Sequence, residues 1–266
     1  MSEFIITKQY KQFAEFCKAC HRDRYIGLCY GPAGAGKTES AIHYTHWDKI
    51  IKNSTDSYIS SQPTPAFSMA RWYSVLYTPQ ILSSPKEVIL DIKKLQRQFS
   101  HLKEATLYPD GIPPHVREEN RNFAELVIID ESERLKSQSF ELIRELYDAG
   151  KTNFIFIGMP GIEKMIERFP QLYSRIGFVH QFKNLGKSEV EFIIAKHFSK
   201  FEIRIDESDF SDQEVVSTII RMTNGNFRLI NRLLKQSKRI MQVNCMTSLT
   251  AEIIAAARKC LLIGEG

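Results

Sequence analysis

The stretch CYGPAGAGKTES, residues 29–40, constrains the fold of this chain more than any other. Before it, RYIGLCY is apolar enough to predict a buried strand, and after it KTESAIHYTHW has the spacing of a helix. Between these two elements stand only glycine, alanine and proline. A loop with so few side chains leaves its backbone open to close approach by a ligand.

Four residues of this stretch match the pattern G-x-x-x-x-G-K-[ST], namely Gly31, Gly36, Lys37 and Thr38. Small residues let backbone N–H groups turn toward phosphate oxygens, and the following helix directs its positive end to the same place. We therefore expect a triphosphate, ATP, with Lys37 at the β- and γ-phosphates and the Thr38 hydroxyl on Mg²⁺. The expected nucleotide-binding residues are Gly31, Pro32, Ala33, Gly34, Ala35, Gly36, Lys37 and Thr38.

Strand patterns alternate with helical ones as far as residue 185. Besides RYIGLCY they are DSYIS, ELVIIDE, NFIFIG and GFVHQF, which predicts an α/β fold with a doubly wound parallel sheet of about five strands flanked by helices. Beyond Leu185 only four helical patterns follow. We expect an α/β nucleotide-binding core over residues 1–185 and a small all-helical lid over residues 186–266.

The strand LVIID ends in two acidic residues, Asp130 and Glu131. A carboxylate at the tip of a strand beside this glycine loop can hold Mg²⁺, and an adjacent one can polarise the attacking water. The pair therefore predicts an ATPase with Asp130 at the metal and Glu131 as the base. Acidic residues that cap the next helix are the simpler alternative.

Two further segments carry local signals. PTPAFSMARWYSVLYTPQIL, residues 63–82, predicts a short helix between prolines. SPKEVILDIKKLQRQFSHL predicts an amphipathic helix that Ser84 caps and Pro85 opens, with Val88, Ile92, Leu95 and Phe99 on one side. Cys17 and Cys20 share one face of another predicted helix, where reduced thiols pack as small apolar groups.

The amino-acid composition adds little to the prediction of function. The net charge of +5 admits nucleic acid as a partner without demonstrating it. No apolar run has the roughly 20 residues that a membrane span needs, and the N-terminus lacks the features of a secretory signal. We expect a cytoplasmic protein without membrane contact.

These motifs resemble the AAA+ ATPases over nearly the whole chain: GPAGAGKT is similar to Walker A and LVIIDE to Walker B. Within FPQLYSRIGFVHQF, the resemblance implies that Arg175 is an arginine finger that acts on a neighbouring subunit's nucleotide, with Arg168 as the weaker alternative. NGNFRLINRLL resembles sensor 2, which implies that Arg228 reaches the phosphates. Where the family carries a polar sensor 1, this chain has Gly158 and Met159, so hydrolysis is expected to be slow or partner-dependent.

Residues 130–166, DESERLK to EKMI, resemble the transposition regulators of the MuB, TnsC and TniB type. That resemblance implies a homo-oligomer, ring or helical filament, that assembles on double-stranded DNA with ATP, selects target sites and recruits a transposase, with a target-selector protein as a further partner. Hydrolysis would then drive disassembly. The cations expected to contact DNA are Lys93, Lys94, Arg97, Arg117, Arg121, Arg134 and Lys136.

Three alternatives stay open. An initiator or helicase loader would also act on nucleic acid, whereas a regulatory AAA+ ATPase would not act on DNA. A small-molecule kinase is the third, although the segment around Arg175 and the helical lid argue against it.

Overall fold

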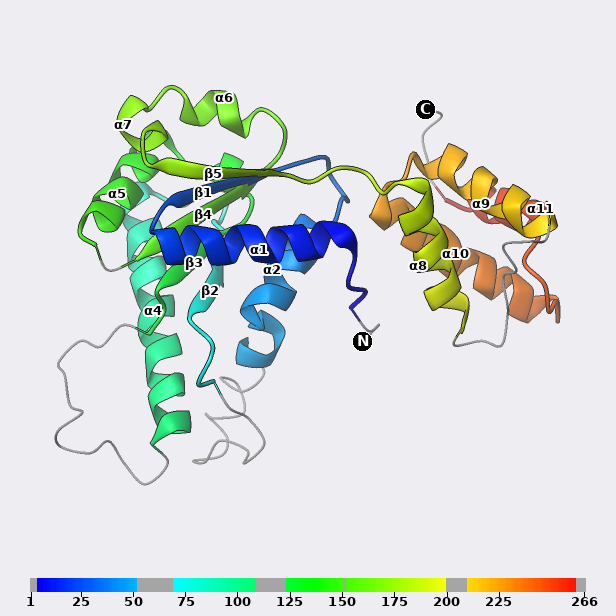
Figure 1. The fold of residues 1–266 in the computed structure, drawn as a ribbon, viewed down its shortest axis with the longest axis horizontal. Helices are drawn as coiled ribbons and strands as arrows, with labels where there is room; N and C mark the ends of the chain where they lie inside the picture. Colours follow the sequence, from blue (N-terminus) through cyan, green and yellow to red (C-terminus); the bar gives the residue numbers. More distant parts are fainter. Residues whose placement is uncertain (1–3, 52–68, 109–122, 151, 200–209, 262–266) are drawn as a thin grey trace. The chain divides into compact units, whose positions relative to one another are not determined.

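A computed structural model of the chain describes residues 4–51, 69–108, 123–150, 152–199 and 210–261 (Figure 1). The chain forms two compact units. The α/β unit comprises Tyr10–Gly31 and Lys37–Gln181, and the helical unit comprises Met1–Gln9, Pro32–Gly36 and Phe182–Gly266. The sequence predicted that one domain ends at residue 185 and the next begins at residue 186. This division into two domains stays a prediction.

The α/β unit is built on a parallel five-stranded sheet of order β2-β3-β4-β1-β5. Every residue of the three central strands is buried or nearly so, which is the pattern of strands covered on both faces. The predicted fold class is therefore confirmed. The strands are β1 (Ile26–Tyr30), β2 (Ser74–Tyr77), β3 (Leu126–Ile129), β4 (Asn153–Gly158) and β5 (Ile176–Gln181).

The second strand was not expected where it lies. We predicted a helix within residues 63–82, but SVLY forms β2 and pairs with β3 over its four residues. Four consecutive buried residues have no periodicity that separates a buried strand from a helical turn, so the pairing with β3 decided the structure. The strand expected at DSYIS, residues 56–60, lies outside the described residues.

Helices cover both faces of this sheet. Successive side chains of a strand point to opposite faces, and in β4 Ile155 and Phe156 are neighbours. A Cβ placed on Gly27 of β1 would lie 3.0 Å from Ile155 and 2.7 Å from Phe16, which belongs to α1. The ring of Phe156 packs at 5.4 Å from that of Phe140 in α5. The described helices of this unit are α1 (Lys8–Asp23), α2 (Lys37–Thr45), α4 (Pro85–Leu107), the 3₁₀ turn η2 (Ser132–Arg134), α5 (Ser137–Asp148), α6 (Ile162–Ile166) and α7 (Pro170–Tyr173).

The signals that predicted α4 operate as expected. The Ser84 hydroxyl accepts from the Glu87 N–H, and the Glu87 carboxylate accepts from the Ser84 N–H, which forms a capping box with Pro85 in the first turn. Val88, Ile92 and Phe99 are buried on the sheet side. Local capping and the apolar spacing are therefore enough to define this helix.

The two cysteines of α1 belong to the core. Cys17 and Cys20 are both free and fully buried. Burial raises the pKa of the Cys20 thiol to about 12 and also raises that of Cys17. Both thiols therefore pack as neutral apolar groups, as the helical spacing predicted.

The helical unit has a core of its own. Its helices are α8 (Lys187–Ser199), α9 (Phe210–Thr223), α10 (Phe227–Val243) and α11 (Ala251–Lys259). Asn226 caps α10 and Thr250 caps α11 through their side-chain oxygens. Gly225 has a φ of +69°, and a Cβ on it would lie 2.2 Å from the Leu185 carbonyl oxygen, so a larger residue does not fit.

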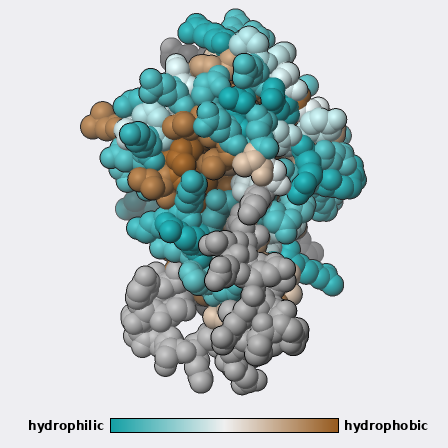
Figure 2. All heavy atoms as spheres, turned by 90° about the vertical axis from the view of Figure 1, so that its left-hand side faces the viewer, coloured by the Kyte–Doolittle hydropathy of each residue, from teal (hydrophilic) through white to brown (hydrophobic). Residues whose placement is uncertain are grey.

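One face of the α/β unit carries exposed apolar side chains. Figure 2 views the molecule from the left of Figure 1, where α4, α5 and α7 lie, and shows an apolar cluster among hydrophilic residues. Ile81, Leu82 and Leu90, before and within α4, are among the exposed large apolar residues. No helix in the described residues combines the length and apolar character that a membrane crossing requires.

Candidate nucleotide-binding site

The glycine loop has the backbone geometry that its sequence predicts. It follows β1, and α2 begins at Lys37, so the N-terminal end of that helix faces the end of the loop. Gly34 and Gly36 adopt φ values of +78° and +99°, which residues with a Cβ rarely tolerate. The glycines are therefore a backbone requirement.

Lys37 lies folded along the end of the sheet rather than in solvent. Its side chain is only 9% exposed, and its ammonium donates to the Gly31 carbonyl at 2.6 Å. The Met159 sulfur, just beyond β4, lies 3.8 Å from the same nitrogen. The Lys37 ammonium is thus held next to the glycine loop and the end of β4.

Thr38 and Asp130 form the most specific contact of the site. The Thr38 hydroxyl donates to the Asp130 Oδ2 at 2.7 Å, although the two residues are 92 positions apart. Asp130 is 3% exposed, and this burial raises the pKa of its carboxyl. Two oxygen ligands meet at the end of the central strands, and these are the ligand types that Mg²⁺ prefers. The residues present therefore fit a magnesium-bound nucleotide.

Glu131 is held in an unusual backbone conformation. Its φ is +50°, in the left-handed region, and its N–H donates to the Asp130 Oδ1 at 2.9 Å. A left-handed non-glycine residue costs about 1–2 kcal/mol, so the surrounding structure must compensate for it. The Asp130 carboxylate thus accepts from the Thr38 hydroxyl through one oxygen and from the Glu131 N–H through the other.

The Glu131 carboxylate forms an ion pair with Arg134, one turn later in η2. The same guanidinium donates to the Pro79 carbonyl at 3.2 Å. Arg134, which we expected to contact DNA, thus faces the predicted catalytic base. The sequence places these residues three apart but does not show that their side chains meet.

The end of β4 lacks the polar residue that the family carries there. A Cβ on Gly158 would lie 3.0 Å from the Glu133 carboxylate and 3.0 Å from Ile162, so a larger side chain here would require these neighbours to shift by a few tenths of an ångström. The Glu133 carboxylate is thus the polar group next to Gly158. Sequence reasoning missed Glu133, because its proximity to β4 depends on the fold of η2.

The predicted arginine finger is engaged within its own chain. Arg175 lies directly before β5, and its guanidinium donates to both oxygens of Asp148 at 3.1 and 3.2 Å. This pair holds the pKa of Asp148 below its ordinary value. Arg168 is exposed and forms no ion pair with any described residue. The role of Arg175 or Arg168 at the nucleotide of a neighbouring subunit therefore stays a prediction.

In the helical unit, the glycine loop contacts the N-terminus of α10. The Asn226 amide donates to the Ala33 carbonyl at 2.7 Å, and the Arg228 N–H donates to the Gly34 carbonyl at 3.1 Å. A Cβ on Gly34 would lie 2.5 Å from the Asn226 Oδ1. The Arg228 guanidinium is exposed, so the observed contact is made by its backbone.

Asn226 is a second residue that the sequence did not single out. Its one local signal was its position before the helix that carries Arg228, where asparagine is a preferred cap. The Asn226 amide ties one carbonyl of the loop to the start of α10. Asn226 therefore stabilises the conformation of the loop.

The cations expected to contact DNA separate into three groups. Lys93, Lys94 and Arg97 are exposed on α4, within five consecutive positions. Lys136 is exposed at the N-terminus of α5, and Arg134 faces Glu131. Arg117 and Arg121 lie outside the described residues.

Comparison with known proteins agrees with this geometry. The family model described as an AAA domain matches residues 20–166, more than half of the chain. This chain belongs to the AAA domain family. Within that family it is a P-loop AAA+ protein, as Walker A and Walker B predicted.

Similar proteins support the family and the fold. A Staphylococcus aureus protein named "Potential ATP-binding protein" is 39% identical over 278 aligned positions, covering 98% of this chain and 97% of that protein. The Thermotoga maritima RuvB Holliday junction branch migration motor superimposes with a TM-score of 0.59 at 16% identity, covering 100% of this chain and 72% of RuvB. Aeropyrum pernix ORC2 superimposes with a TM-score of 0.59 at 15% identity, covering 97% of this chain and 70% of ORC2.

Proposed function

We propose that this protein is an ATP-hydrolysing AAA+ regulator of DNA transposition that assembles on double-stranded DNA. The observation that carries the ATPase part is the Thr38–Asp130 hydrogen bond with Glu131 adjacent to it. This arrangement supplies two oxygen ligands for a metal and a separate carboxylate for water. The transposition part rests on the likeness of residues 130–166 to transposition regulators.

Each residue has a distinct role in this proposal. Lys37 neutralises charge at the terminal phosphates, and the N-terminal end of α2 adds to the same field. Thr38 and Asp130 would hold Mg²⁺, which would neutralise phosphate charge when bound. Glu131 accepts a proton from the attacking water while its backbone stays tied to Asp130.

Assembly would complete the site from a neighbouring copy. A guanidinium from the next subunit stabilises the charge that develops at the γ-phosphate, and Arg175 is the residue proposed to supply it. Because Arg175 is bonded to Asp148 within its own chain, it must exchange this partner for the phosphate on assembly. The proposed role of Arg228 is to sense the phosphates from the lid.

Exposed side chains within α4 and just before it provide surfaces that macromolecular partners can bind. Lys93, Lys94 and Arg97 form a compact cationic group that can contact DNA phosphates without reading sequence. Ile81, Leu82 and Leu90 expose apolar surface that a transposase, a target selector or another copy could cover. RuvB, named as a Holliday junction branch migration motor, shares the fold, which supports an action on DNA.

The test of the DNA function compares two triple variants. K93A/K94A/R97A removes the cationic group of α4, and K235A/R239A/K259A removes three exposed cations of the helical unit as the control. With ATP, duplex DNA should stimulate turnover and assembly of the wild type and of the control. The α4 variant should need about tenfold more DNA and show a shallower salt dependence. If saturating duplex DNA changes neither turnover nor assembly of the wild type, the DNA proposal is wrong.

One second function has a specific observation in its favour. The similarity to ORC2 also fits an initiator or helicase loader. Electron microscopy with an ATP analogue separates the two, because continuous filaments on random duplex favour the transposition regulator. Closed rings confined to one DNA sequence or to a helicase partner favour the initiator or loader.

Replacing Arg134 with alanine should raise basal ATP turnover about two- to fivefold. The ion pair occupies the Glu131 carboxylate, and exposed pairs of this kind are worth up to about 1 kcal/mol. Steady-state hydrolysis measures the effect, and R22A removes an arginine from an exposed pair with Asp23 as the control. A fall in turnover would instead mean that Arg134 positions the base.

Replacing Asn226 with serine should weaken ATP binding about three- to tenfold without lowering the melting temperature. Serine still caps α10, but it is too short to donate to the Ala33 carbonyl, and one hydrogen bond is worth about 0.5–1.5 kcal/mol. Calorimetric titration measures the affinity. N226A, which also loses the cap, should lower stability by about 1 kcal/mol. Wild-type affinity in N226S would show that the loop needs no support from α10.

A further inference from the structure

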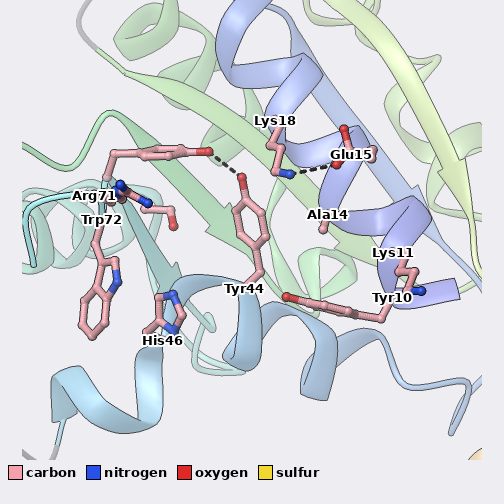
Figure 3. Close-up of a pocket in the computed structure, with 11 residues that line it drawn as sticks. Tyr10, Lys11, Ala14, Glu15, Lys18, Tyr44, His46, Arg71 and Trp72 are labelled. Carbon is pink, nitrogen blue, oxygen red and sulfur yellow. Dashed lines mark hydrogen bonds and ion pairs between the residues drawn. The ribbon is translucent and has the colours of Figure 1, made fainter. Parts of the chain in front are cut away.

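A cavity lies within the α/β unit, between α1, the C-terminal end of α2 and the segment that leads into β2 (Figure 3). Its volume is about 720 Å³, which lies in the range of pockets for ligands the size of a nucleotide. Its described lining contains none of the residues placed in the phosphate-binding site. The ATPase proposal therefore leaves this cavity without a function.

Aromatic rings form much of the cavity wall. Tyr10, Tyr44, His46, Trp72 and Tyr73 come from three different segments of the chain. The hydroxyls of Tyr44 and Tyr73 are hydrogen-bonded at 2.6 Å, and Trp72 stacks on His46 with 4.4 Å between ring centroids. These contacts hold the rings in place before any ligand arrives.

The rim of the cavity is positively charged. Lys18 is neutralised by Glu15 at 2.8 Å, but Lys11 and Arg71 are exposed and form no ion pair with any described residue. Figure 3 shows Lys11 and Arg71 apart, with Tyr44 between them. Burial lowers the pKa of His46, so the stack with Trp72 adds no cation at neutral pH. The two unpaired cations therefore determine the charge that the cavity prefers.

We propose that this cavity binds one unpaired nucleotide of a single-stranded nucleic acid. Aromatic faces with cations beside them are the surfaces on which single strands stack and neutralise their phosphates. In a strand, each base has a phosphate on both sides, which matches cations at two separated points of the rim. A free mononucleotide has a phosphate on one side only, and a paired base does not expose a face to these rings.

Trp72 provides a direct reporter for the test. The chain has two tryptophans, so W47F leaves Trp72 as its only indole. In the full-length W47F protein, unlabelled oligothymidylate should quench Trp72 fluorescence saturably. Thymidine monophosphate should bind at least about tenfold more weakly, because it reaches one cation and not two, and a blunt duplex of the same length should not quench.

Two variants locate the binding in this cavity. K11A/R71A should weaken oligothymidylate binding about tenfold and reduce its salt dependence by about two ions. Y10A should weaken it by a similar factor through lost stacking, whereas K235A/R239A, with the same charge change on α10, should not. K37A should bind the strand as the parent does, which separates this site from the P-loop.

Three results would overturn the proposal. The first is no quenching by the single strand in a W47F protein that melts as the wild type does. The second is equal quenching by the duplex or by the monophosphate, which would indicate a duplex surface or a small-molecule site. The third is unchanged affinity in K11A/R71A, whose two side chains are exposed. None of these results bears on the ATPase proposal. The K37A and E131Q variants test that proposal separately.

Discussion

Replacing Lys37 with alanine should reduce the affinity for Mg·ATP by at least about 30-fold. The Lys37 ammonium is the buried cation at the start of α2, and its loss would leave the phosphate charge without its main partner. Truncation of one member of a buried, hydrogen-bonded charge pair costs about 2–5 kcal/mol of binding free energy. Isothermal titration with a non-hydrolysable ATP analogue measures this loss.

The matched control for this prediction is K235A, an exposed lysine of α10. It changes the net charge by the same amount and should bind nucleotide as the wild type does. K37A also removes the donor to the Gly31 carbonyl, so its unfolding free energy should fall by about 1 kcal/mol. Nucleotide affinity within threefold of the wild type in a folded K37A protein would refute the proposed phosphate site.

Replacing Glu131 with glutamine should reduce ATP turnover by about 10²- to 10⁴-fold and leave nucleotide affinity nearly unchanged. An amide keeps the size of the side chain and the Glu131 N–H bond to Asp130, but it cannot accept a proton from water. The variant should therefore accumulate in the ATP-bound, assembled state. Single-turnover hydrolysis and sedimentation with ATP measure the two effects.

Glu133 provides the control for this second prediction. It is an exposed carboxylate on the same 3₁₀ turn, two residues away, and lies next to Gly158 rather than Asp130. E133Q should keep most of the wild-type turnover. Equal turnover in E131Q and the wild type would exclude Glu131 as the base. A large loss of turnover in E133Q, with normal turnover in E131Q, would indicate that Glu133 and not Glu131 acts in hydrolysis.

The parts of the fold that depend on neighbours in the chain were predicted correctly. Walker A required glycines at positive φ between a strand and a helix, and Gly34 and Gly36 adopt that conformation. The capping box at Ser84 and the apolar spacing of α4 likewise act over a few residues. Such features are readable from a sequence because covalent geometry and local hydrogen bonds determine them.

Other features depended on segments far apart in the chain. β2 exists because four buried residues pair with β3, and no local pattern distinguished them from a helix. The partner of Arg175 is Asp148, 27 residues earlier, and the loop carbonyl of Ala33 is bonded by Asn226, 193 residues later. Side-chain type and spacing do not report such contacts.

The sequence alone determined the family and the parallel sheet, because strand, loop and helix follow one another directly, and it predicts which residues would meet a nucleotide. The tertiary structure alone decided which partner each charged group takes, and it assembled the aromatic cavity from α1, α2 and the approach to β2. The physical reason is that ion pairs and cavities form where the packed core brings remote segments together. Their energies depend on distances that only the folded chain defines.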